Sequence, residues 1–308
     1  MKSVAVIVTH NRIDLLKECL DCVNSQEIPF SRIIVVDNHS TDGTKEYLDK
    51  IEDPRYIVIH SEKNCGGAGG FSMGLQEAQK DDYDWVLILD DDAMISPDYM
   101  KILIEAGEKH KDVPALCGSV YAQDEIDLTH RRRVGNKLIF SEHSVDAKEY
   151  QKDEFYCDTV TFCGLLMRGS AFRKYGIPIK DYFIWCDDTE YCLRMYKNGE
   201  RMLTVPKAVL NHRTTRSENK GSILMRIEWK SYYGYRNRYD ATKRHIGGLT
   251  PIVIRLEYKI FYLASIIMRL SPNEEKRKQG EFNCSLLKDV LKDTKSGYLG
   301  VREKYLWK

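Results

Sequence analysis

The sequence predicts an α/β fold: a mostly parallel sheet flanked by helices, followed by a helical C-terminal extension. About the first 120 residues alternate short apolar runs with segments of helical periodicity, which indicates right-handed strand–helix–strand units. The chain of 308 residues is 43% hydrophobic, enough to bury one large core or one core with an appendage. Beyond residue 240 the pattern becomes basic and mainly helical.

The individual elements follow in order from these runs. Strands are expected at Ser3–Thr9, Arg32–Val36, Tyr56–His60, Trp85–Leu89 and Ala115–Tyr121. Helices are expected between them at 12–25, 40–51, 71–80 and 98–109, the second beginning with hydroxyl and carboxylate side chains that favour helix starts. The opening MKSVAVIVTHNR has a short apolar run and no small-residue cleavage site, so it is predicted to be a first strand and not a signal peptide.

Cysteine usage indicates a reducing compartment. The nine cysteines are scattered, and several lie inside predicted helices or strands, which is typical of reduced thiols in a cytoplasm. Cys19 and Cys22 have the spacing of a metal or redox pair, but they lie on a predicted helix and have no second pair at zinc-finger spacing. We therefore expect them to face the core.

Charge is unevenly distributed along the chain, although the net charge is only +1. Residues 1–200 have a balance of −12 and residues 201–308 a balance of +13. Such asymmetry indicates an anionic surface or ligand on the basic side, and lipid headgroups and diphosphates are both candidates. Nucleic acid is not an expected partner, because no known nucleic-acid module is present and the rest of the chain is acidic.

Three consecutive acids, Asp90, Asp91 and Asp92, follow the apolar run Trp85–Leu89. Adjacent carboxylates repel one another, and a cation compensates them. Oxygen ligands suit Mn²⁺ or Mg²⁺, ions that bridge phosphate oxygens. A solvated acidic turn is the alternative, but open α/β sheets bind ligands at the carboxyl ends of their strands, and this position favours a metal site.

A glycine-rich segment, Asn64-Cys65-Gly66-Gly67-Ala68-Gly69-Gly70, follows the third predicted strand. It does not match the dinucleotide fingerprint, which follows the first strand and requires glycine where Ser72 stands. Glycines here would let the backbone approach a bulky ligand and leave helix-start amides available to anions. A flexible loop without a ligand is the alternative.

Two further segments of the middle region carry charge or apolar character. Residues 122–156 are a polar excursion that includes three adjacent arginines, 131–133, which we expect to be solvated, with contact to an acceptor phosphate as the alternative. The apolar run Val160–Arg168 follows. Asp187, Asp188 and Glu190 then stand at the predicted start of a helix, where the helix dipole favours acids. One of them is equally well interpreted as a general base in a cleft.

These segments, in this order and spacing, resemble the inverting family 2 glycosyltransferases with the GT-A (Rossmann-like) fold. The resemblance covers about residues 3–240 and is strongest to bacterial galactofuranosyl- and rhamnosyltransferases. It implies a nucleotide-sugar part at about 1–120, an acceptor part at about 121–240, and a basic C-terminal region at 241–308. The motifs that carry it are VAVIVTHNR, VVDNHSTDGT, EKNCGGAGGF, ILDDDA, FCGLLMRGSAFRKYGIP, FIWCDDTEYCLR and the histidine of LNHRT.

The resemblance implies roles for the matching positions. Asp90, Asp92 and His212 would hold Mn²⁺ or Mg²⁺ against the donor diphosphate. Asp188 would be the catalytic base, with Trp185, Asp187 and Glu190 at the acceptor. Cys186 departs from the related enzymes, which have tryptophan there, and this puts the acceptor's identity in doubt. The implied contacts to the nucleotide sugar are Thr9, Asn11, Arg12, Asp37, Asn64, Gly66, Gly67, Asp90, Asp91 and Arg236.

The implied function is metal-dependent, inverting transfer of a sugar to a glycan acceptor, lipid-linked, in bacterial cell-surface polysaccharide synthesis. UDP-galactofuranose is the expected donor and dTDP-rhamnose the alternative. A nucleotidyltransferase is a second alternative, although that class would place a glycine-rich loop after the first strand, where THNRID stands. A non-catalytic assembly subunit is the third.

Two segments near the C-terminus, Trp229–Arg238 and residues 251–270, each allow more than one role. In Trp229–Arg238, Arg236 would reach a phosphate, or the helix would pack its aromatic side chains inward. Residues 251–270 have an apolar stripe interrupted by charges, too many for a membrane span. They fit a helix lying on the inner face of the membrane, or one packed on the catalytic domain or on a second subunit of a homo-oligomer. The stripe is Val253, Leu256, Ile260, Leu263, Ile267 and Leu270.

Overall fold

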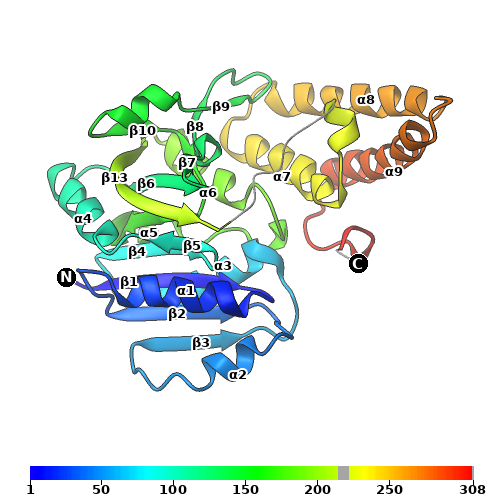
Figure 1. Cartoon of the computed structure of the whole chain (residues 1–308). Coiled ribbons are helices and arrows are strands. Elements are labelled where there is room, and N and C mark those ends of the chain that lie inside the picture. The colour runs from blue at the N-terminus through cyan, green and yellow to red at the C-terminus, as the bar shows by residue number, and fades with distance from the viewer. Residues whose placement is uncertain (214–221, 307–308) are drawn as a thin grey trace.

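The computed structural model describes residues 1–213 and 222–306 (Figure 1). Its centre is a ten-stranded mixed sheet. The strands of this sheet are β1 Ser3–Thr9, β2 Arg32–Asp37, β3 Tyr56–His60, β4 Trp85–Asp90, β5 Ala93–Ile95, β6 Ala115–Ala122, β7 Glu125–Ile126, β10 Phe155–Cys157, β12 Leu165–Arg168 and β13 Met202–His212. A second sheet of three strands comprises β8 Arg131–Val134, β9 Glu142–Ser144 and β11 Thr159–Val160.

The main sheet has the order β10-β13-β6-β12-β4-β1-β2-β3. The strands β3, β2, β1, β4, β6 and β13 run in one direction, and β12 lies antiparallel between β4 and β6. The predicted mostly parallel sheet is therefore confirmed. The predicted strand limits agree with the structure to within one residue.

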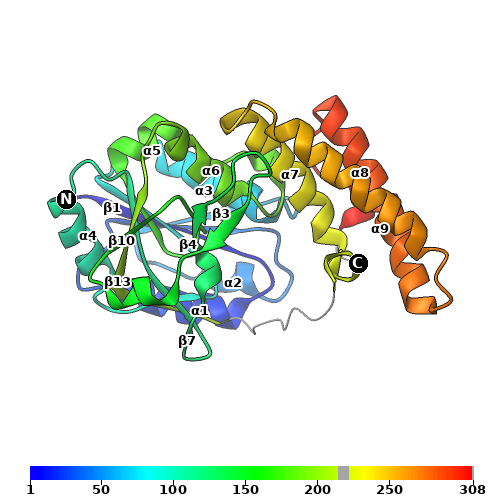
Figure 2. The ribbon, with the colours of Figure 1, turned by 90° about the horizontal axis from the view of Figure 1, so that it is seen from above.

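Helices cover both faces of the sheet. They are α1 Ile13–Asn24, α2 Thr44–Leu48, α3 Gly66–Ala78, α4 Tyr99–Lys109, α5 Gly169–Tyr175, α6 Asp187–Lys197, α7 Trp229–His245, α8 Thr250–Met268 and α9 Glu274–Ser296. One core packs α1, α2 and α4 on the sheet through residues such as Leu16, Leu48 and Leu103. The opposite core packs α3, α5 and α6 through residues such as Leu75 and Phe172. Figure 2 shows α3, α5 and α6 on the side of the sheet away from α1 and α2.

The helices α7, α8 and α9 share a third core and extend beyond the sheet at one end of the molecule (Figures 1 and 2). This arrangement confirms the predicted helical extension. The predicted limit at residue 240 falls inside α7, which spans Trp229–His245. No helix in 1–213 or 222–306 is long and apolar enough to cross a membrane.

The glycine-rich segment differs from its prediction, because α3 begins at Gly66 and the segment is the first turns of a helix. Close packing on β1 explains Gly70 and the later Gly74 of the same helix. A Cβ at Gly70 would lie 2.5 Å from Cγ1 of Val8, and one at Gly74 would lie 2.5 Å from Cγ1 of Val6. The missing side chains thus let α3 approach the sheet closely.

The prediction of solvated arginines is wrong for Arg131, which is fully buried. Its guanidinium donates to the carbonyl oxygens of Gly118 at 3.1 Å, His130 at 3.0 Å and Cys163 at 3.4 Å, which compensates the cost of burying the charge. The core-facing position predicted for Cys19 and Cys22 is confirmed, because Cys19 is buried in the core and Cys22 is partly buried against it. All nine cysteines lie in the described ranges, where they are free thiols.

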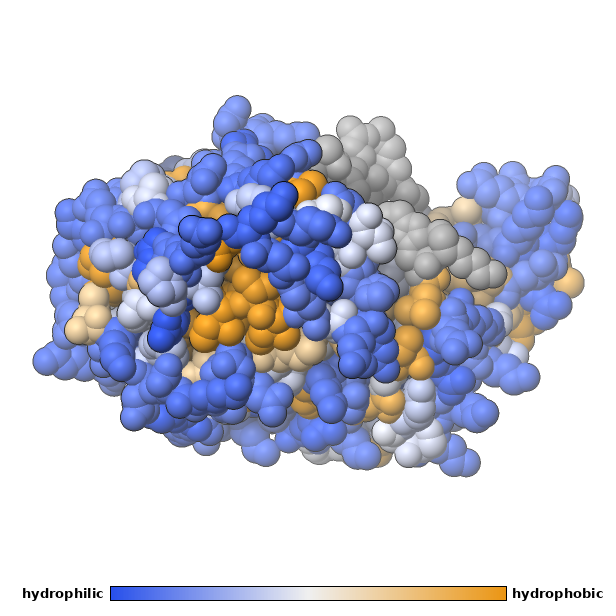
Figure 3. All heavy atoms as spheres, turned by 90° about the horizontal axis from the view of Figure 1, so that it is seen from below, coloured by the Kyte–Doolittle hydropathy of each residue, from blue (hydrophilic) through white to orange (hydrophobic). Residues whose placement is uncertain are grey.

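The edge strand β3 lies on the side of the molecule seen from below in Figure 3, where apolar side chains gather in the middle of the face. All five of its residues, Tyr56–His60, are partly exposed. This face is on the opposite side of the molecule from α8 (Figure 1).

Candidate active site

A cleft of about 1920 Å³ opens at the carboxyl ends of the central strands. It is lined by the ends of β1 and β4, the start of α3, the segment that leads into α6, part of α7, and residues within 300–306. The sheet register explains why polar groups converge there. Val8 lies opposite Asp90, and Thr9 lies opposite Asp37, so the strands end at one edge.

The three consecutive acids meet a hydroxyl and a guanidinium from the β1–α1 connection. Thr9 Oγ1 donates to Asp91 Oδ2 at 2.7 Å. Arg12 Nη1 donates to Asp91 Oδ1 at 3.2 Å and to Asp92 Oδ2 at 2.6 Å. The structure thus brings together Thr9, Arg12 and the acids at the end of β4.

This acidic cluster holds more negative charge than its partners compensate. Burial, together with neighbouring Asp92, raises the pKa of Asp90 to about 7. Burial also raises the pKa of Asp91 to about 6, against the opposing charge of Arg12. For Asp92, burial is outweighed by hydrogen bonds and charge from His212 and Arg12, so its pKa is lowered. An additional cation would therefore be favourable here.

His212, at the end of β13, reaches this cluster from the other side. Its Nε2 lies 3.1 Å from Asp92 Oδ1, and its Nδ1 is buried without a hydrogen-bond partner. As they stand, the described residues contain no group of three or more His, Cys, Asp or Glu side chains arranged to hold a metal ion. The convergence of Asp92 and His212, with the uncompensated Asp90 beside them, nevertheless fits an oxygen- and imidazole-binding divalent cation.

Three of the other side chains predicted to contact the nucleotide sugar fall into two groups. Asn11 and Asn64 line the cleft. Asn11 Oδ1 accepts from Thr41 N at 2.7 Å, and Asn64 Oδ1 accepts from Gly66 N at 2.8 Å. Asp37 is buried beside the cleft instead, where it accepts from Ser40 N at 2.9 Å and contacts His60 Nδ1 at 3.0 Å. Its position supports the turn that carries the cleft wall.

The start of α3 joins the two sides of the cleft. Gly66 has φ +70°, and a Cβ there would lie 2.0 Å from the carbonyl oxygen of Phe183. That oxygen accepts from Ala68 N at 3.1 Å. Gly67 has no neighbour within 4 Å of a Cβ position and lines the cleft. The glycine segment therefore contacts the loop before α6 while leaving room for a ligand.

Asp187 and Asp188 are in the first turn of α6 and line the same cleft. Burial and the charge of Asp188 raise the pKa of Asp187 to about 8. Burial raises the pKa of Asp188 as well, opposed by Arg132, whose Nη2 lies 3.9 Å from Asp188 Oδ2. Asp188 Oδ1 accepts from Thr189 N at 2.5 Å. Asp188 is partly buried, and a carboxylate in that position with one nearby guanidinium suits proton abstraction from an acceptor hydroxyl.

The loop that presents these acids has an unusual backbone. Phe183, Trp185 and Cys186 have φ of 67°, 64° and 64°, which non-glycine residues rarely adopt. Trp185 is 42% exposed and lines the cleft, and it packs on α7 at Gly234, where a Cβ would lie 2.8 Å from Trp185 Cε3. The absence of a side chain at Gly234 thus makes room for the indole.

Asn237, on α7, holds this loop in place. Its Nδ2 donates to the carbonyl oxygens of Tyr182 at 3.0 Å, Ile184 at 3.1 Å and Trp185 at 2.8 Å. No sequence pattern predicted this role for Asn237. Only its position next to Arg236, in a helix segment rich in aromatic residues, distinguishes it in the sequence.

Replacing Asn237 by alanine is expected to remove about 1–3 kcal/mol of stability, because buried carbonyl groups lose their donor. Transfer should fall at least about tenfold through misplaced acids, whereas nucleotide binding should persist. Denaturant unfolding, steady-state kinetics and calorimetric titration measure the three quantities. Asn283→Ala is the matched control, since Asn283 is equally buried but bonds Leu224 O, far along the chain from the loop. Equal losses of transfer in both variants would contradict a positioning role.

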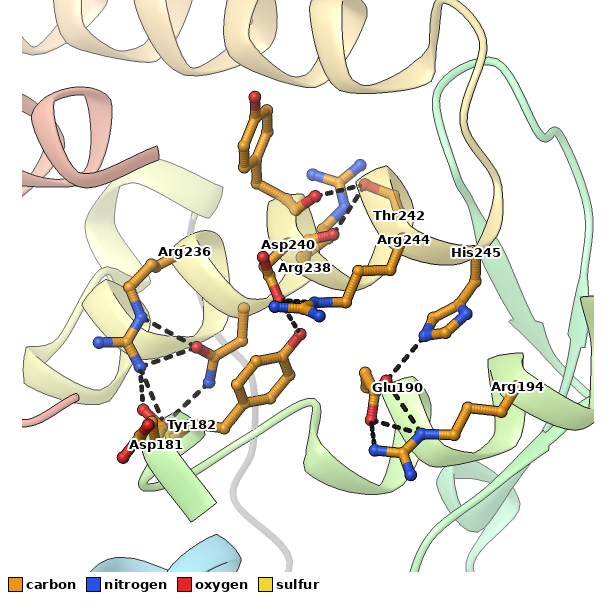
Figure 4. A network of polar contacts seen from close by, with 12 residues as sticks. Asp181, Tyr182, Glu190, Arg194, Arg236, Arg238, Asp240, Thr242, Arg244 and His245 are labelled. Atoms are coloured by element: carbon orange, nitrogen blue, oxygen red, sulfur yellow. Dashed lines mark hydrogen bonds and ion pairs between the residues drawn. The ribbon is translucent and has the colours of Figure 1, made fainter. Parts of the chain in front are cut away.

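Figure 4 shows that Glu190 and Arg236 are engaged elsewhere. Glu190 accepts from Arg194 Nη2 at 2.7 Å and lies 2.7 Å from His245 Nε2, which ties α6 to the end of α7. Arg236 donates to the carbonyl oxygens of Asp181 at 3.0 Å and Tyr182 at 3.1 Å, and to that of Gly300. The structure does not bring either side chain to the cleft, and for α7 the inward packing of aromatics is the arrangement found.

The cleft also contains residues that the sequence analysis missed or expected elsewhere. Arg132 stands between Asp188 and Glu142, with Nη1 3.6 Å from Glu142 Oε2. Residues 300–306 return to the cleft after α9. Tyr305 stacks on Tyr232 with ring centroids 4.5 Å apart, and Gly300 N donates to Asp181 O at 2.8 Å. No pattern in the tail indicated this return.

Comparison with known sequences places these features in a family. The model of the family "Glycosyl transferase family 2" matches residues 4–176 of this chain. The chain is 28% identical over 244 residues to galactofuranosyltransferase GlfT1 of Mycolicibacterium smegmatis, covering 76% of this chain and 80% of that protein. It is 25% identical over 260 residues to rhamnosyltransferase WbbL of Escherichia coli, covering 78% of this chain and 92% of that protein.

Solved structures show the same fold. GalNAc-T7 with UDP, GalNAc and Mn²⁺ matches with a TM-score of 0.63 at 15% identity, covering 97% of this chain, which spans 58% of that protein's chain. S. aureus TarS 1–349 in complex with UDP matches with a TM-score of 0.52 at 14% identity, covering 97% of this chain and 92% of that one. The predicted GT-A architecture is confirmed by these likenesses.

Proposed function

This chain belongs to glycosyltransferase family 2, and we propose that it moves galactofuranose from UDP-galactofuranose to a glycan acceptor with inversion at the anomeric carbon. That it is a glycosyltransferase follows from the family and its relatives. One observation carries the proposed metal-dependent, single-displacement reaction. The uncompensated acids at the end of β4 and the carboxylates of Asp187 and Asp188 at the start of α6 face a single cleft.

The donor diphosphate would lie at the β4 end of the cleft. Asp92 and His212, with Asp90, would hold Mn²⁺ or Mg²⁺ there, and such an ion supplies positive charge that offsets the charge gathering on the departing diphosphate. Arg12 stands at the same place and adds a fixed guanidinium. Thr9 and Arg12 restrain Asp91, which orders the turn that carries the acids.

The acceptor would enter at the α6 end. Asp188 takes the proton from the acceptor hydroxyl as that oxygen forms a bond to the anomeric carbon. The bond from this carbon to the diphosphate oxygen breaks in the same step, and the electron pair leaves with UDP. One displacement inverts the configuration and requires no covalent enzyme intermediate. The positive charge of Arg132 would stabilise the ionised form of Asp188, the form that can accept the proton.

The proposal of galactofuranose rests on the galactofuranosyltransferase relatives, and rhamnosyltransferase WbbL makes dTDP-rhamnose the second candidate. We also propose a lipid-linked acceptor in bacterial cell-surface polysaccharide synthesis and a position at the inner membrane face. The excess of basic residues after residue 200 supports this position.

Incubation with UDP-galactofuranose, dTDP-rhamnose and UDP-hexopyranoses in the presence of Mn²⁺ tests the proposal. The expected result is release of UDP from UDP-galactofuranose alone, with a product whose anomeric configuration by NMR is opposite to the donor's. Turnover of dTDP-rhamnose alone would establish the alternative donor. Release of pyrophosphate from sugar phosphate and nucleoside triphosphate would identify a nucleotidyltransferase, and absence of turnover on the whole panel would favour an assembly subunit.

A further inference from the structure

The outer face of α8 is a continuous stripe of large apolar side chains. Each of the seven is more than half exposed, from 56% to 81% of its surface. We call this surface the α8 stripe, and its residues are Leu249, Ile252, Leu256, Ile260, Leu263, Ile267 and Leu270. Their spacing of three and four residues places them on one side of the helix. An apolar surface of this continuity is uncommon on a monomer in water.

The opposite side of the same helix is already packed. Ile254, Tyr258 and Ser265 are fully buried against α7 and α9. Tyr258 OH donates to Tyr235 O at 2.8 Å, which fixes this face. The α8 stripe therefore takes no part in packing α8 against α7 and α9. A helix that is apolar on both sides is typically covered on both sides.

Charge around the stripe indicates what covers it. Residues 243–278 contain eight Lys and Arg but three acids. Within α8 the one acid is Glu257, and it is engaged with Arg238 Nη1 at 3.0 Å. Lys259 is exposed at the edge of the stripe, next to Ile260. Arg244 and Lys278 pair with Asp240 and Glu274, and the remaining basic side chains still outnumber the acids around them. The surface thus combines apolar side chains with an excess of positive charge.

A second copy of the chain and a membrane place different demands on Lys259. Helix pairing through the stripe would bring Lys259 against the same positively charged edge of the partner, with loss of its hydration. At a membrane its long side chain extends to the lipid phosphates while its methylene groups stay with the apolar surface. Anionic headgroups would also attract the surrounding basic residues. These charges favour lipid.

We propose that the α8 stripe docks in the headgroup region of an anionic membrane, with α8 lying along the surface. The stripe extends over about 32 Å, at 1.5 Å per residue, which gives the helix a long contact parallel to the bilayer. This inference deepens the proposed position at the membrane, since it identifies the surface that would contact the lipid. Its evidence lies in α8 and does not depend on the reaction.

The test is co-flotation of the full chain with vesicles of phosphatidylcholine, with or without phosphatidylglycerol, in the absence of any sugar nucleotide. The chain should float with the anionic vesicles and bind the neutral ones more weakly. Ile260→Thr/Ile267→Thr should lower partitioning about tenfold, because two exposed anchors of the stripe lose apolar area. The control is Ile57→Thr/Ile59→Thr on β3, the same chemical change on the opposite side of the molecule (Figures 1 and 3). These two side chains are partly buried against the core, so circular dichroism first verifies that the control is folded, and the folded control should then partition normally.

Three outcomes would overturn this proposal. The chain could fail to bind anionic vesicles, or the α8 and β3 pairs could have equal effects. Alternatively, sedimentation could show a dimer that the α8 pair dissociates, which would assign the stripe to a second copy. Transfer to a soluble acceptor glycan, measured in parallel, separates failure of membrane docking from failure of the proposed reaction.

Discussion

Replacing Asp188 by asparagine should lower the rate of sugar transfer about a thousandfold and leave nucleotide binding unchanged. Asparagine keeps the size and the contact with Thr189 N but cannot accept the proton of the acceptor hydroxyl. General bases contribute factors of about 10² to 10⁴, so the loss should lie in kcat and not in the donor KM. Steady-state kinetics and calorimetric titration with UDP measure the two quantities separately.

Asp181→Asn provides the matched control for this change. Asp181 lines the same cleft, but its described contacts in the fold use its backbone oxygen, which the substitution keeps. Transfer by this variant should stay within about threefold of the original, as for a surface change without a special contact. Loss of nucleotide binding in Asp188→Asn, or equal loss of transfer in both variants, would contradict the role of Asp188 as the base.

Replacing Asp92 by asparagine should abolish the Mn²⁺-dependent part of nucleotide binding and, with it, transfer. Asp92 is the carboxylate on which Arg12 and His212 converge, and their hydrogen bonds and charges lower its pKa and favour its ionised form. Removing its charge leaves Asp90, whose raised pKa disfavours the ionised form, and Asp91, whose oxygens already accept from Thr9 and Arg12. Titration of UDP with and without Mn²⁺ measures the difference.

The other end of the same strand supplies the control for Asp92. Asp84 precedes β4 and accepts from Lys2 N at 2.7 Å, away from the cleft. Asp84→Asn should bind UDP as the unchanged chain does, with or without the ion. If Asp92→Asn retained Mn²⁺-dependent binding, the cation would have to be held by other groups, and the assignment of Asp92 and His212 would fail.

Strand positions were predictable because the sheet is buried on both faces. The apolar runs that form β1 and β4 are continuous and too short for a buried helix, so a buried strand is the natural prediction. Polar residues of the site stand at the ends of these runs. The acids at 90–92 and 187–188 were accessible to sequence reasoning for the same reason. Each group directly follows or begins a regular element, so its place at the edge of the sheet follows from the topology.

Features that depend on contacts between distant segments were not predictable. Arg131 is buried because it donates to carbonyl groups from β6 and from the segment before β12, and nothing local in Arg131-Arg132-Arg133 distinguishes it from a solvated run. Glu190 and Arg236 have the residue types of ligands, but the approach of α7 to α6 engages both. Asn237 and residues 300–306 gain their positions from the C-terminal fold alone.

For the glycine-rich segment, the close approach of the backbone to a neighbour was predicted correctly, but the secondary structure was not. Gly70 and Gly74 approach Val8 and Val6 of β1, whereas only Gly67 leaves open space for a ligand in the cleft. A helix start was therefore interpreted as a loop, because glycine lowers helix propensity and packing on the sheet outweighs that preference here.

The proposed reaction requires a cation at the end of β4 that carries the diphosphate of an activated sugar. Crystals grown with UDP and Mn²⁺, measured at the manganese absorption edge, test it directly. The predicted result is an anomalous peak in contact with Asp92 and His212, with the diphosphate beside it and the uridine toward Asn11. A peak and a nucleotide bound away from the carboxyl ends of β1 and β4 would contradict it.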